Sequence, residues 1–459
     1  MTKIVGLKNY SYIDINSVKK VYFIGIGGIS MSSIAFMSKR AGLEVAGYDR
    51  TESDMTRRLS DAGITVYYSY SPDNAVGSDI VVYTAAMSED DPEMKRAREL
   101  GIPLMSRAEY FGQLMLSYGR RLGVSGMHGK TTATSMLTHI YLAAELDPTV
   151  MVCAELSCID GAFRVGGADN MVFEACEYTD SFLSFYPTTA VVLNIEMDHV
   201  DYFHSLEQII TSFNRYIDKA EIAVVNGDDG NVKKCIEGYG GRVVTFGLGD
   251  SCDFRAANIS GAKPEFDVVH GGEVLAHIKL GVLGIHSVYN ALASFAAAYV
   301  NGVAVDAIVR GLESFRGAKR RFELRGTIDP DTEIYDDYAH HPTEIRATLT
   351  SASEYAKERN GRLRIVFQPH TYSRTYELFD DFKTSFALAD EVIFADIYAA
   401  REINTYGVTS DQLAEASGGK YIDSFEGIAR YVRETAVSGD VVIVMGAGDI
   451  VAVSGMILG

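Results

Sequence analysis

The sequence is poor in cysteine, in positive charge and in long hydrophobic runs, and each shortage excludes a class of protein. Its 459 residues include five cysteines, none of them in a CxxC pair. Neither a disulfide framework nor a structural zinc site is therefore expected. An odd number of unpaired thiols fits a reducing compartment, so we predict a cytoplasmic location and a reduced, buried thiol at Cys176.

Positive charge is also scarce. The chain has 42 Lys and Arg against 61 Asp and Glu, a net charge of −19. A protein that binds nucleic acid needs a basic surface to neutralise the phosphates, so no nucleic-acid partner is expected. An anionic substrate must instead be held by a few local cations and backbone N–H groups.

No segment approaches the roughly 18 uninterrupted apolar residues that a spanning helix needs, and the first residues lack the apolar core of a signal peptide. We therefore expect no membrane insertion. Small molecules are the expected partners, with a homodimer left open as an alternative to a monomer.

The length suggests about three domains at roughly 150 residues each. In residues 1–118, short apolar strands such as "VYFIG", "EVAGYD" and "DIVVYTAA" alternate with helical segments such as "ISMSSIAFMSKRAG". This βαβ rhythm is typical of a doubly wound parallel sheet. We predict a Rossmann-like N-terminal domain.

The same rhythm restarts twice. Residues 119–320 contain the strand "RRLGVSG", a helix from "TTATSMLTHIYLAAE", the strands "NMVFEAC", "TAVVLNIE" and "EIAVVNGDD", and an antiparallel pair in "FDVVHGG" and "VLAHIKL". Residues 321–459 contain the strands "TEIYDDYA", "RLRIVFQPH", "EVIFADIYAA" and "DVVIVMGAG". The predicted fold class is α/β: a central P-loop-type ATPase domain with a mostly parallel sheet lies between two Rossmann-like domains.

The stretch "GVSGMHGKTT" at residues 123–132 resembles a phosphate-binding loop, although Val124 stands where the common motif has its first glycine. Gly126 and Gly129 are spaced to let the backbone wrap a phosphate. Lys130 would then meet phosphate oxygens, and the Thr131 hydroxyl would meet a magnesium ion, at the start of a helix. The alternative is a plain glycine turn with an exposed lysine.

A second glycine cluster, "GIGGIS", follows the first predicted strand. It fits GxGxxG except for Ser30 at the last position, and Asp49 lies at the end of the second strand. A dinucleotide fold would place such an acid on a ribose hydroxyl. An NAD-dependent oxidoreductase and a generic nucleotide-diphosphate site explain this pattern equally well.

Acidic residues and a histidine follow two strands of the central domain. Because the carboxyl ends of parallel strands meet at one edge, these side chains should converge near Lys130 and Thr131, where they could bind Mg²⁺ held by a nucleotide. They are Glu174, Glu177, Glu196, Asp198, His199 and Asp201.

Three polar clusters occur later in the chain. Histidines that are neighbours in sequence do not easily share one metal ion, so we expect hydrogen-bonding or stacking roles for those in "DDYAHHPTE". The arginines near the predicted boundary are candidates for bridging nucleotide phosphates when domains close. The clusters are "GIHSVYNALAS" with His286 and Asn290, "KRRFELRG" with Lys319, Arg320 and Arg321, and "DDYAHHPTE" with Asp336, Asp337, His340 and His341.

Taken together, these motifs resemble the ATP-dependent Mur ligases of bacterial peptidoglycan synthesis. The resemblance covers the whole chain in order, and eight weak signals in sequence make it specific. They are "VYFIGIGGISMSSIA", "GMHGKTT", "FEACEYTDSFL", "LNIEMDHVDYF", "HSVYNALA", "RRFE", "DDYAHHPTEI" and "QPHTYSRT".

The resemblance implies a three-domain enzyme that binds UDP-N-acetylmuramate in the first domain, ATP with one or two Mg²⁺ ions in the second, and an amino acid, L-alanine, in the third. Phosphorylation activates the muramoyl carboxylate. The amine then attacks the acyl phosphate to give an amide, ADP and phosphate. Some family members support a second metal with a carbamylated lysine, but the predicted helix "LEQIITSFNRYID" has no lysine.

Residue roles also follow from the resemblance. It implies that Lys130, Glu174 and His199 are catalytic, and that the magnesium ligands are Thr131, Glu174 and His199. ATP would contact Gly126, His128, Gly129, Lys130, Thr131, Thr132, Asn290, Arg321, Asp337 and His341. The UDP-sugar would contact Gly25, Gly27, Gly28, Ser30, Asp49 and Arg107. The amino acid would contact Tyr338, His340, His370 and Arg374.

Three alternatives stay open at this point. A recycling ligase of the same family would attach a preformed tripeptide to the same UDP-sugar. An NAD-dependent dehydrogenase would use "GIGGIS" and Asp49 but would leave the phosphate loop unexplained. A nucleotide-gated binding protein would bind ATP at Lys130 without turnover.

Overall fold

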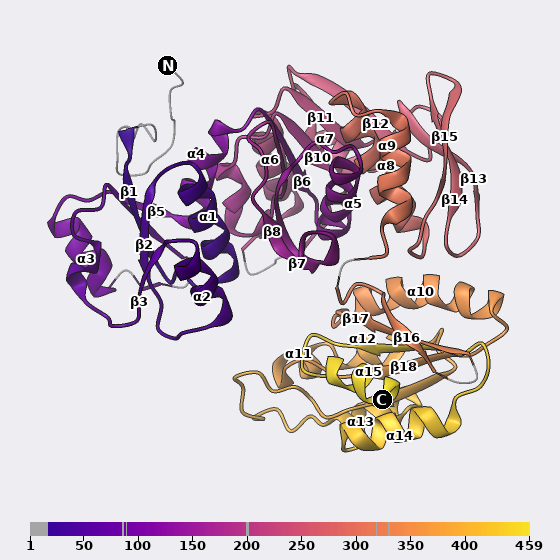
Figure 1. Cartoon of the computed structure of the whole chain (residues 1–459). Helices are drawn as coiled ribbons and strands as arrows, with labels where there is room; N and C mark the ends of the chain where they lie inside the picture. The colour runs from indigo at the N-terminus through magenta and orange to yellow at the C-terminus, as the bar shows by residue number, and fades with distance from the viewer. Residues whose placement is uncertain (1–16, 85–86, 89, 199–201, 318, 329–330) are drawn as a thin grey trace. The chain divides into compact units, whose positions relative to one another are not determined.

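The computed structural model describes residues 17–84, 87–88, 90–198, 202–317, 319–328 and 331–459. Its contacts divide the chain into two compact units, Met1–Arg255 with Leu292–Gly311, and Ala256–Ala291 with Leu312–Gly459. Three sheets of five, ten and six strands follow one another along the chain (Figure 1). The predicted α/β class is confirmed, whereas the residue limits of the three domains stay a prediction. In the described part of the chain, no helix is long and apolar enough to cross a membrane.

The first sheet is fully parallel in the order β3-β2-β1-β4-β5. Alternate residues of β1 face opposite sides, as the period of a strand requires. Val21 and Phe23 pack with α1 and α4, while Tyr22 and Ile24 pack with α3. The strands are β1 (Lys20–Ile24), β2 (Glu44–Tyr48), β3 (Thr65–Tyr67), β4 (Ile80–Tyr83) and β5 (Leu104–Ser106). The helices are α1 (Ile29–Arg40), α2 (Asp54–Asp61), α3 (Pro92–Glu99) and α4 (Arg107–Leu114).

The central sheet has the order β15-β14-β13-β12-β11-β10-β6-β9-β7-β8. Its core strands are parallel, and two antiparallel pairs, β7 with β8 and β14 with β15, lie at its ends. The strands are β6 (Arg120–Ser125), β7 (Thr149–Leu156), β8 (Gly161–Arg164), β9 (Asn170–Glu174), β10 (Thr189–Val192), β11 (Ile222–Asn226), β12 (Arg242–Gly247), β13 (Phe254–Ser260), β14 (Glu265–His270) and β15 (Glu273–Lys279).

Helices cover this sheet where their apolar faces fit it. Phe213 and Ile217 of α6 and Val232 of α7 belong to one buried cluster with Val192 and Val225 of the strands. On α5, Ala133 accepts a hydrogen bond from Ser294 of α8 at 3.1 Å. The helices are α5 (Lys130–Ala143), α6 (Leu206–Ile217), α7 (Gly230–Cys235), α8 (Ile285–Val300) and α9 (Val305–Ser314), with the 3-10 segment η5 (Tyr178–Ser184) before β10.

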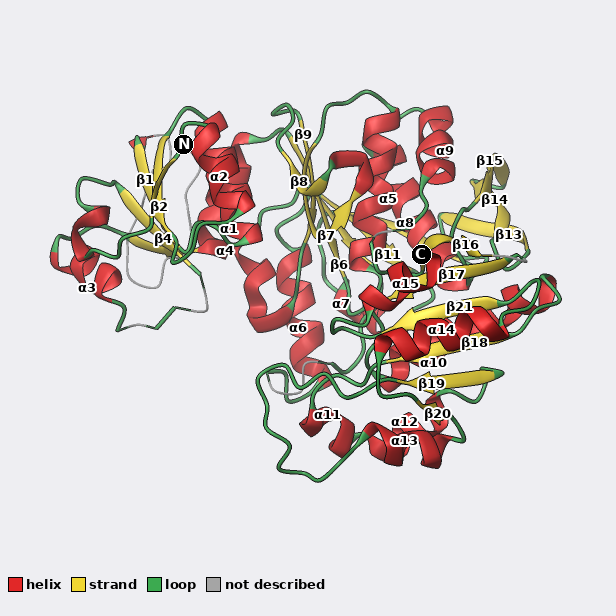
Figure 2. Cartoon of the chain, turned by 60° about the horizontal axis from the view of Figure 1, so that its bottom comes forward, coloured by secondary structure: helices red, strands yellow, loops and turns green. Residues whose placement is uncertain are grey.

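The C-terminal sheet has the order β16-β17-β21-β18-β19-β20, parallel except at β16. One face packs against α14 and α15 and the other against α10, α12 and α13 (Figure 2). The strands are β16 (Glu323–Ile328), β17 (Thr332–Asp337), β18 (Leu363–Phe367), β19 (Glu391–Phe394), β20 (Lys420–Tyr421) and β21 (Val441–Met445). The helices are α10 (Pro342–Glu358), α11 (Tyr372–Glu377), α12 (Phe379–Ser385), α13 (Ser410–Ser417), α14 (Phe425–Thr435) and α15 (Val451–Leu458).

Candidate active site

The loop between β6 and α5 has the backbone of a phosphate-binding loop. Gly129, directly before α5, has φ of 83°, and Gly126 has φ of 142°, angles that side chains disfavour. A Cβ on Gly126 would lie 3.0 Å from the Cβ of Leu193, so this glycine also lets the loop approach the end of β10. The first turn of α5 contains Lys130, Thr131 and Thr132, and its free N–H groups favour an anion.

Lys130 is held above this loop by three acceptors. Its Nζ donates to the carbonyl oxygens of Gly126 at 2.7 Å and Met127 at 3.1 Å, and to Oε1 of Glu177 at 3.0 Å. The Lys130 side chain is 14% exposed and that of Glu177 is fully buried. Glu177, which the sequence placed among acids near a metal, thus balances the charge of the phosphate-loop lysine.

Thr131 and Glu174 form the pair of oxygen donors at the same sheet edge. The Thr131 hydroxyl lies 3.1 Å from both Oε1 and Oε2 of Glu174, and the Cys153 N–H donates to Oε2 at 2.9 Å. Hard oxygen donors beside a phosphate loop suit Mg²⁺. The predicted ligand His199 and its neighbour Asp201 lie outside the described residues. Within the described ranges, no group of three or more His, Cys, Asp and Glu side chains could hold a metal ion.

Asn194, which follows β10, holds the phosphate loop through two hydrogen bonds to the backbone of His128. Its Oδ1 accepts the His128 N–H at 2.8 Å, and its Nδ2 donates to the His128 carbonyl at 2.9 Å. The His128 ring adds a 2.7 Å contact from Nε2 to Oε1 of Glu196. Asn194 was not among the site residues predicted from the sequence. It directly follows a strand expected to lie next to β6, and this position could have indicated its role.

Arg107, at the start of α4, acts on this site through its charge. Cys153 is accessible to solvent, yet desolvation by the surrounding protein raises the pKa of its thiol to about 12. The charge of Glu174 adds to this rise, and the charge of Arg107 opposes it. Arg107 therefore acts electrostatically on the strand segment that hydrogen-bonds Glu174. Cys176 is a free thiol, as predicted, but it is only half-buried.

The remaining sugar-site candidates gather where β1 and β2 end. Gly25, with φ of 78°, turns the chain after β1, and α1 begins after Gly28 without a side-chain cap. The Gly27 N–H donates to Oδ2 of Asp49 at 2.8 Å, and a Cβ on Gly27 would lie 2.7 Å from that oxygen. Ser30 lies in the first turn of α1. The structure thus brings together the glycine loop and the acid that the sequence paired with it.

In the C-terminal sheet, Asp337 ends β17 and is held by backbone donors. Its Oδ2 accepts the Phe322 N–H at 2.9 Å and its Oδ1 the Ala339 N–H at 2.8 Å. Burial raises the pKa of this carboxyl to about 6, although these N–H groups and the charge of Arg321 oppose the rise. The guanidinium groups of Arg320 and Arg321 lie 5.0 and 5.4 Å from the centre of the Tyr338 ring.

The amino-acid candidates meet beside this cluster. The rings of His340 and His370 are 5.8 Å apart, and Nη1 of Arg374 lies 3.2 Å from Nδ1 of His370. Burial lowers the pKa of both imidazoles, and Arg374 lowers that of His370 further. Both rings are therefore neutral near pH 7.

Two ATP candidates have structural roles of their own. His341 caps α10, because its ring nitrogen accepts the Thr343 N–H at 3.3 Å while Glu344 binds the His341 N–H. Asn290 is buried in α8.

Comparison with known proteins agrees with this three-sheet arrangement. Residues 20–118 match the model of the Mur ligase family catalytic domain, residues 124–298 the Mur ligase middle domain, and residues 320–448 the Mur ligase glutamate ligase domain. The UDP-N-acetylmuramate–L-alanine ligase of Agathobacter rectalis is 43% identical over 96% of this chain and 98% of its own length. The ligase of the same name from Caldicellulosiruptor saccharolyticus is 45% identical over 94% of this chain and 97% of its own.

Solved structures give the same result. The crystal structure of UDP-N-acetylmuramate-alanine ligase from Thermotoga maritima matches with a TM-score of 0.76 and 27% identity, over 96% of this chain and 98% of that one. A murein peptide ligase from Psychrobacter arcticus shares the fold with a TM-score of 0.64 at 24% identity, over 96% and 98%. With three family domains in order and relatives of this identity along nearly its whole length, the chain belongs to the Mur ligase family.

Proposed function

We propose that this chain joins L-alanine to the carboxylate of UDP-N-acetylmuramate, with ATP converted to ADP and phosphate, in peptidoglycan precursor synthesis. The observation that carries the proposal is the phosphate loop with Lys130, Thr131 and Glu174 at one sheet edge, in a chain 43% identical to an L-alanine ligase over nearly its full length. Among the solved structures, the alanine ligase of Thermotoga maritima matches with a TM-score of 0.76, and the murein peptide ligase of Psychrobacter arcticus with a TM-score of 0.64.

The residues suit two successive transfers. A carboxylate oxygen of the sugar attacks the γ-phosphorus and ADP leaves, so two anions must approach each other. Lys130 and the N–H groups of α5 would offset this repulsion and stabilise the transferring phosphoryl group. Arg107 adds a positive charge on the sugar side.

The ammonium group of L-alanine first loses a proton. The amine nitrogen then attacks the acyl carbon, phosphate leaves, and the nitrogen loses a second proton. Arg374 offers a planar fork for the carboxylate of the amino acid. Neutral imidazoles at His340 and His370 do not repel its ammonium group. Tyr338 completes this face of the site.

Thr131 and Glu174 would hold Mg²⁺, with His199 as the third ligand that the resemblance implies. When bound, the ion would neutralise phosphate charge during transfer. The assignments of Asn290, Arg321, Asp337 and His341 to ATP, and of Gly25, Gly27, Gly28, Ser30 and Asp49 to the UDP-sugar, belong to the same proposal.

Phosphate release tests the function. The purified chain should release phosphate with ATP, Mg²⁺, UDP-N-acetylmuramate and L-alanine, and much more slowly when a tripeptide replaces alanine. Lys130→Ala should abolish release, whereas Lys357→Ala, at the exposed C-terminal end of α10, should not. Absence of turnover with L-alanine would contradict the proposal, and tight NADH binding would support the dehydrogenase alternative instead. A cytoplasmic location, a homodimer and the absence of a nucleic-acid partner remain predictions.

A further inference from the structure

Glu402 reaches across the C-terminal unit to the start of α11. It belongs to the loop between β19 and α13, and its partner Ser373 lies 29 residues earlier. Its Oε2 accepts the Ser373 N–H at 3.0 Å, and its Oε1 accepts the Ser373 hydroxyl at 2.5 Å. Both carboxylate oxygens thus accept hydrogen bonds from the first turn of α11.

The first turn of α11 needs this support. The helix spans only Tyr372–Glu377, and its N-cap residue Thr371 has φ of 68° and makes no side-chain cap. An isolated helix of this length is unstable in water, and a threonine in the left-handed region is strained. A carboxylate at the N-terminus satisfies free N–H groups and interacts favourably with the helix dipole.

The same loop holds the preceding residues at a second point. The Thr371 N–H donates to the Tyr398 carbonyl at 2.9 Å, and the His370 ring stacks on the Tyr398 ring at 5.5 Å and 26°. Arg374, one residue after Ser373, lies with its Nη1 3.2 Å from Nδ1 of His370. Tyr398 therefore fixes His370, and Glu402 fixes the turn that carries Arg374.

We propose that Glu402 is a positioning residue for amino-acid recognition, which holds the first turn of α11 so that Arg374 can pair with the carboxylate of the incoming L-alanine. The inference rests on the proposed function and deepens it. The hydrogen bonds from Ser373 also lower the pKa of Glu402, so the carboxylate stays charged at physiological pH.

The test is Glu402→Ala, which removes the acceptors of both the Ser373 N–H and the Ser373 hydroxyl. We expect KM for L-alanine to rise about tenfold, with kcat and the KM values for ATP and UDP-N-acetylmuramate within about twofold of wild type. Glu377→Ala makes the same truncation at the exposed other end of α11 and should leave all constants unchanged.

Ser373→Ala provides a second route, because it keeps the backbone N–H bond and removes only the hydroxyl bond. It should raise the KM for L-alanine by a smaller factor, about threefold, without loss of fold. The inference would be overturned if the KM for L-alanine were unchanged in both variants. It would also be overturned if kcat fell without a selective rise in the KM for L-alanine. Failure of the wild-type chain to use L-alanine would instead contradict the proposed function, so the two failures are distinguishable.

Discussion

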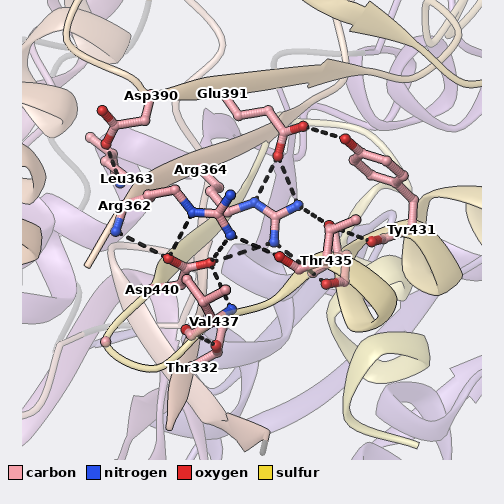
Figure 3. Close-up of polar contacts among 12 residues, drawn as sticks. Thr332, Arg362, Leu363, Arg364, Asp390, Glu391, Tyr431, Thr435, Val437 and Asp440 are labelled. Carbon is pink, nitrogen blue, oxygen red and sulfur yellow. Dashed lines mark hydrogen bonds and ion pairs between the residues drawn. The ribbon is translucent and has the colours of Figure 1, made fainter. Parts of the chain in front are cut away.

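At the amino edge of the C-terminal sheet, where β17, β18, β19 and β21 begin, oppositely charged side chains form a network of ion pairs and hydrogen bonds (Figure 3). Asp440 is fully buried and accepts from Nη2 of Arg362 at 2.7 Å and from the Val437 N–H at 3.1 Å. Arg364 is also fully buried, 2.7 Å from Glu391. Each buried charge thus has an opposite charge and further hydrogen bonds, the condition for burying it without a large penalty.

At the carboxyl edge, where the same strands end, the arginines face rings and carbonyls instead. Arg374 contacts the His370 ring, and Arg321 lies over the Tyr338 ring, with Oε1 of Glu344 4.0 Å from its Nη1. Arg320 donates to the Gly448 carbonyl at 3.2 Å. Guanidinium groups held by rings and carbonyl oxygens are suited to anionic ligands. We therefore expect one edge of the sheet to serve stability and the other to serve binding.

Asp440 and Asp337, one buried at each edge, differ accordingly in their pKa values. Burial favours the neutral form of Asp440, but the hydrogen bonds from Arg362 outweigh it and lower the pKa. Asp337 has backbone donors and a more distant Arg321, so burial dominates and raises the pKa to about 6. Removing each group should consequently have a different effect.

The largest expected effect is that of Asp440→Ala. It leaves Arg364 buried beside an unfilled acceptor site and removes the partner of Arg362, so we expect a loss of about 3–5 kcal/mol in the free energy of unfolding. Urea denaturation followed by circular dichroism measures it. Glu426→Ala, exposed on α14, is the control and should change stability by less than about 0.5 kcal/mol. Comparable losses in the two variants would show that the amino-edge network is not stabilising.

The next effect is a pH dependence. Because the pKa of Asp337 in the folded state, about 6, lies above its ordinary value of 3.8, its contribution to stability is present below about pH 4 and lost as pH rises through 6. The shift corresponds to roughly 3 kcal/mol. Asp337→Asn should be less stable overall, because one backbone donor loses its acceptor, but it should lack this loss between pH 4 and 7. Stability curves of wild type and variant that stay parallel over this range would contradict the raised pKa.

Arg374→Ala separates binding from stability at the carboxyl edge. We expect KM for L-alanine to rise about 10- to 100-fold, because a charge-assisted pair with a carboxylate is lost. The free energy of unfolding should change by less than about 0.5 kcal/mol. Arg401→Ala, exposed on the neighbouring loop, should leave KM unchanged. If the Arg374 variant instead unfolded at a lower temperature and kept a normal KM for L-alanine, this arginine would contribute to stability and not to binding.

Most of the strands and the phosphate loop could be predicted from the sequence, because both depend on local pattern. Apolar runs between glycine turns indicated β6, β9, β10 and β21, and the two glycines before Lys130 indicated the loop. The β7–β8 pair was missed. In this pair Glu155 and Asp160 interrupt the apolar pattern, and Asp160 turns the chain with φ of 49°, a conformation that side-chain patterns do not indicate. Helix α9 (Val305–Ser314) was likewise not predicted.

The convergence of candidate site residues could be predicted where strand ends determine it. Glu174 lies beside Thr131, and Asp49 beside Gly27, as the order of a parallel sheet indicates. Asn194, although inside "LNIEMDHVDYF", and Glu402 were not singled out, because the role of each depends on a partner 66 or 29 residues away. Such contacts depend on how loops return to the sheet, which sequence spacing does not specify.

The smallest expected effect lies at the rim of the amino edge. The Tyr431 hydroxyl bonds Oε1 of Glu391 at 2.6 Å and Nζ of Lys420 at 2.6 Å. Tyr431→Phe keeps the ring and its packing, and Glu391 keeps both contacts with Arg364, so we expect a loss of only about 1 kcal/mol in unfolding free energy. KM for L-alanine should stay unchanged, since no group at the carboxyl edge moves. A stability loss as large as that of Asp440→Ala would mean that the network acts as one cooperative unit from rim to centre, whereas a change in KM would mean that the two edges of the sheet are coupled.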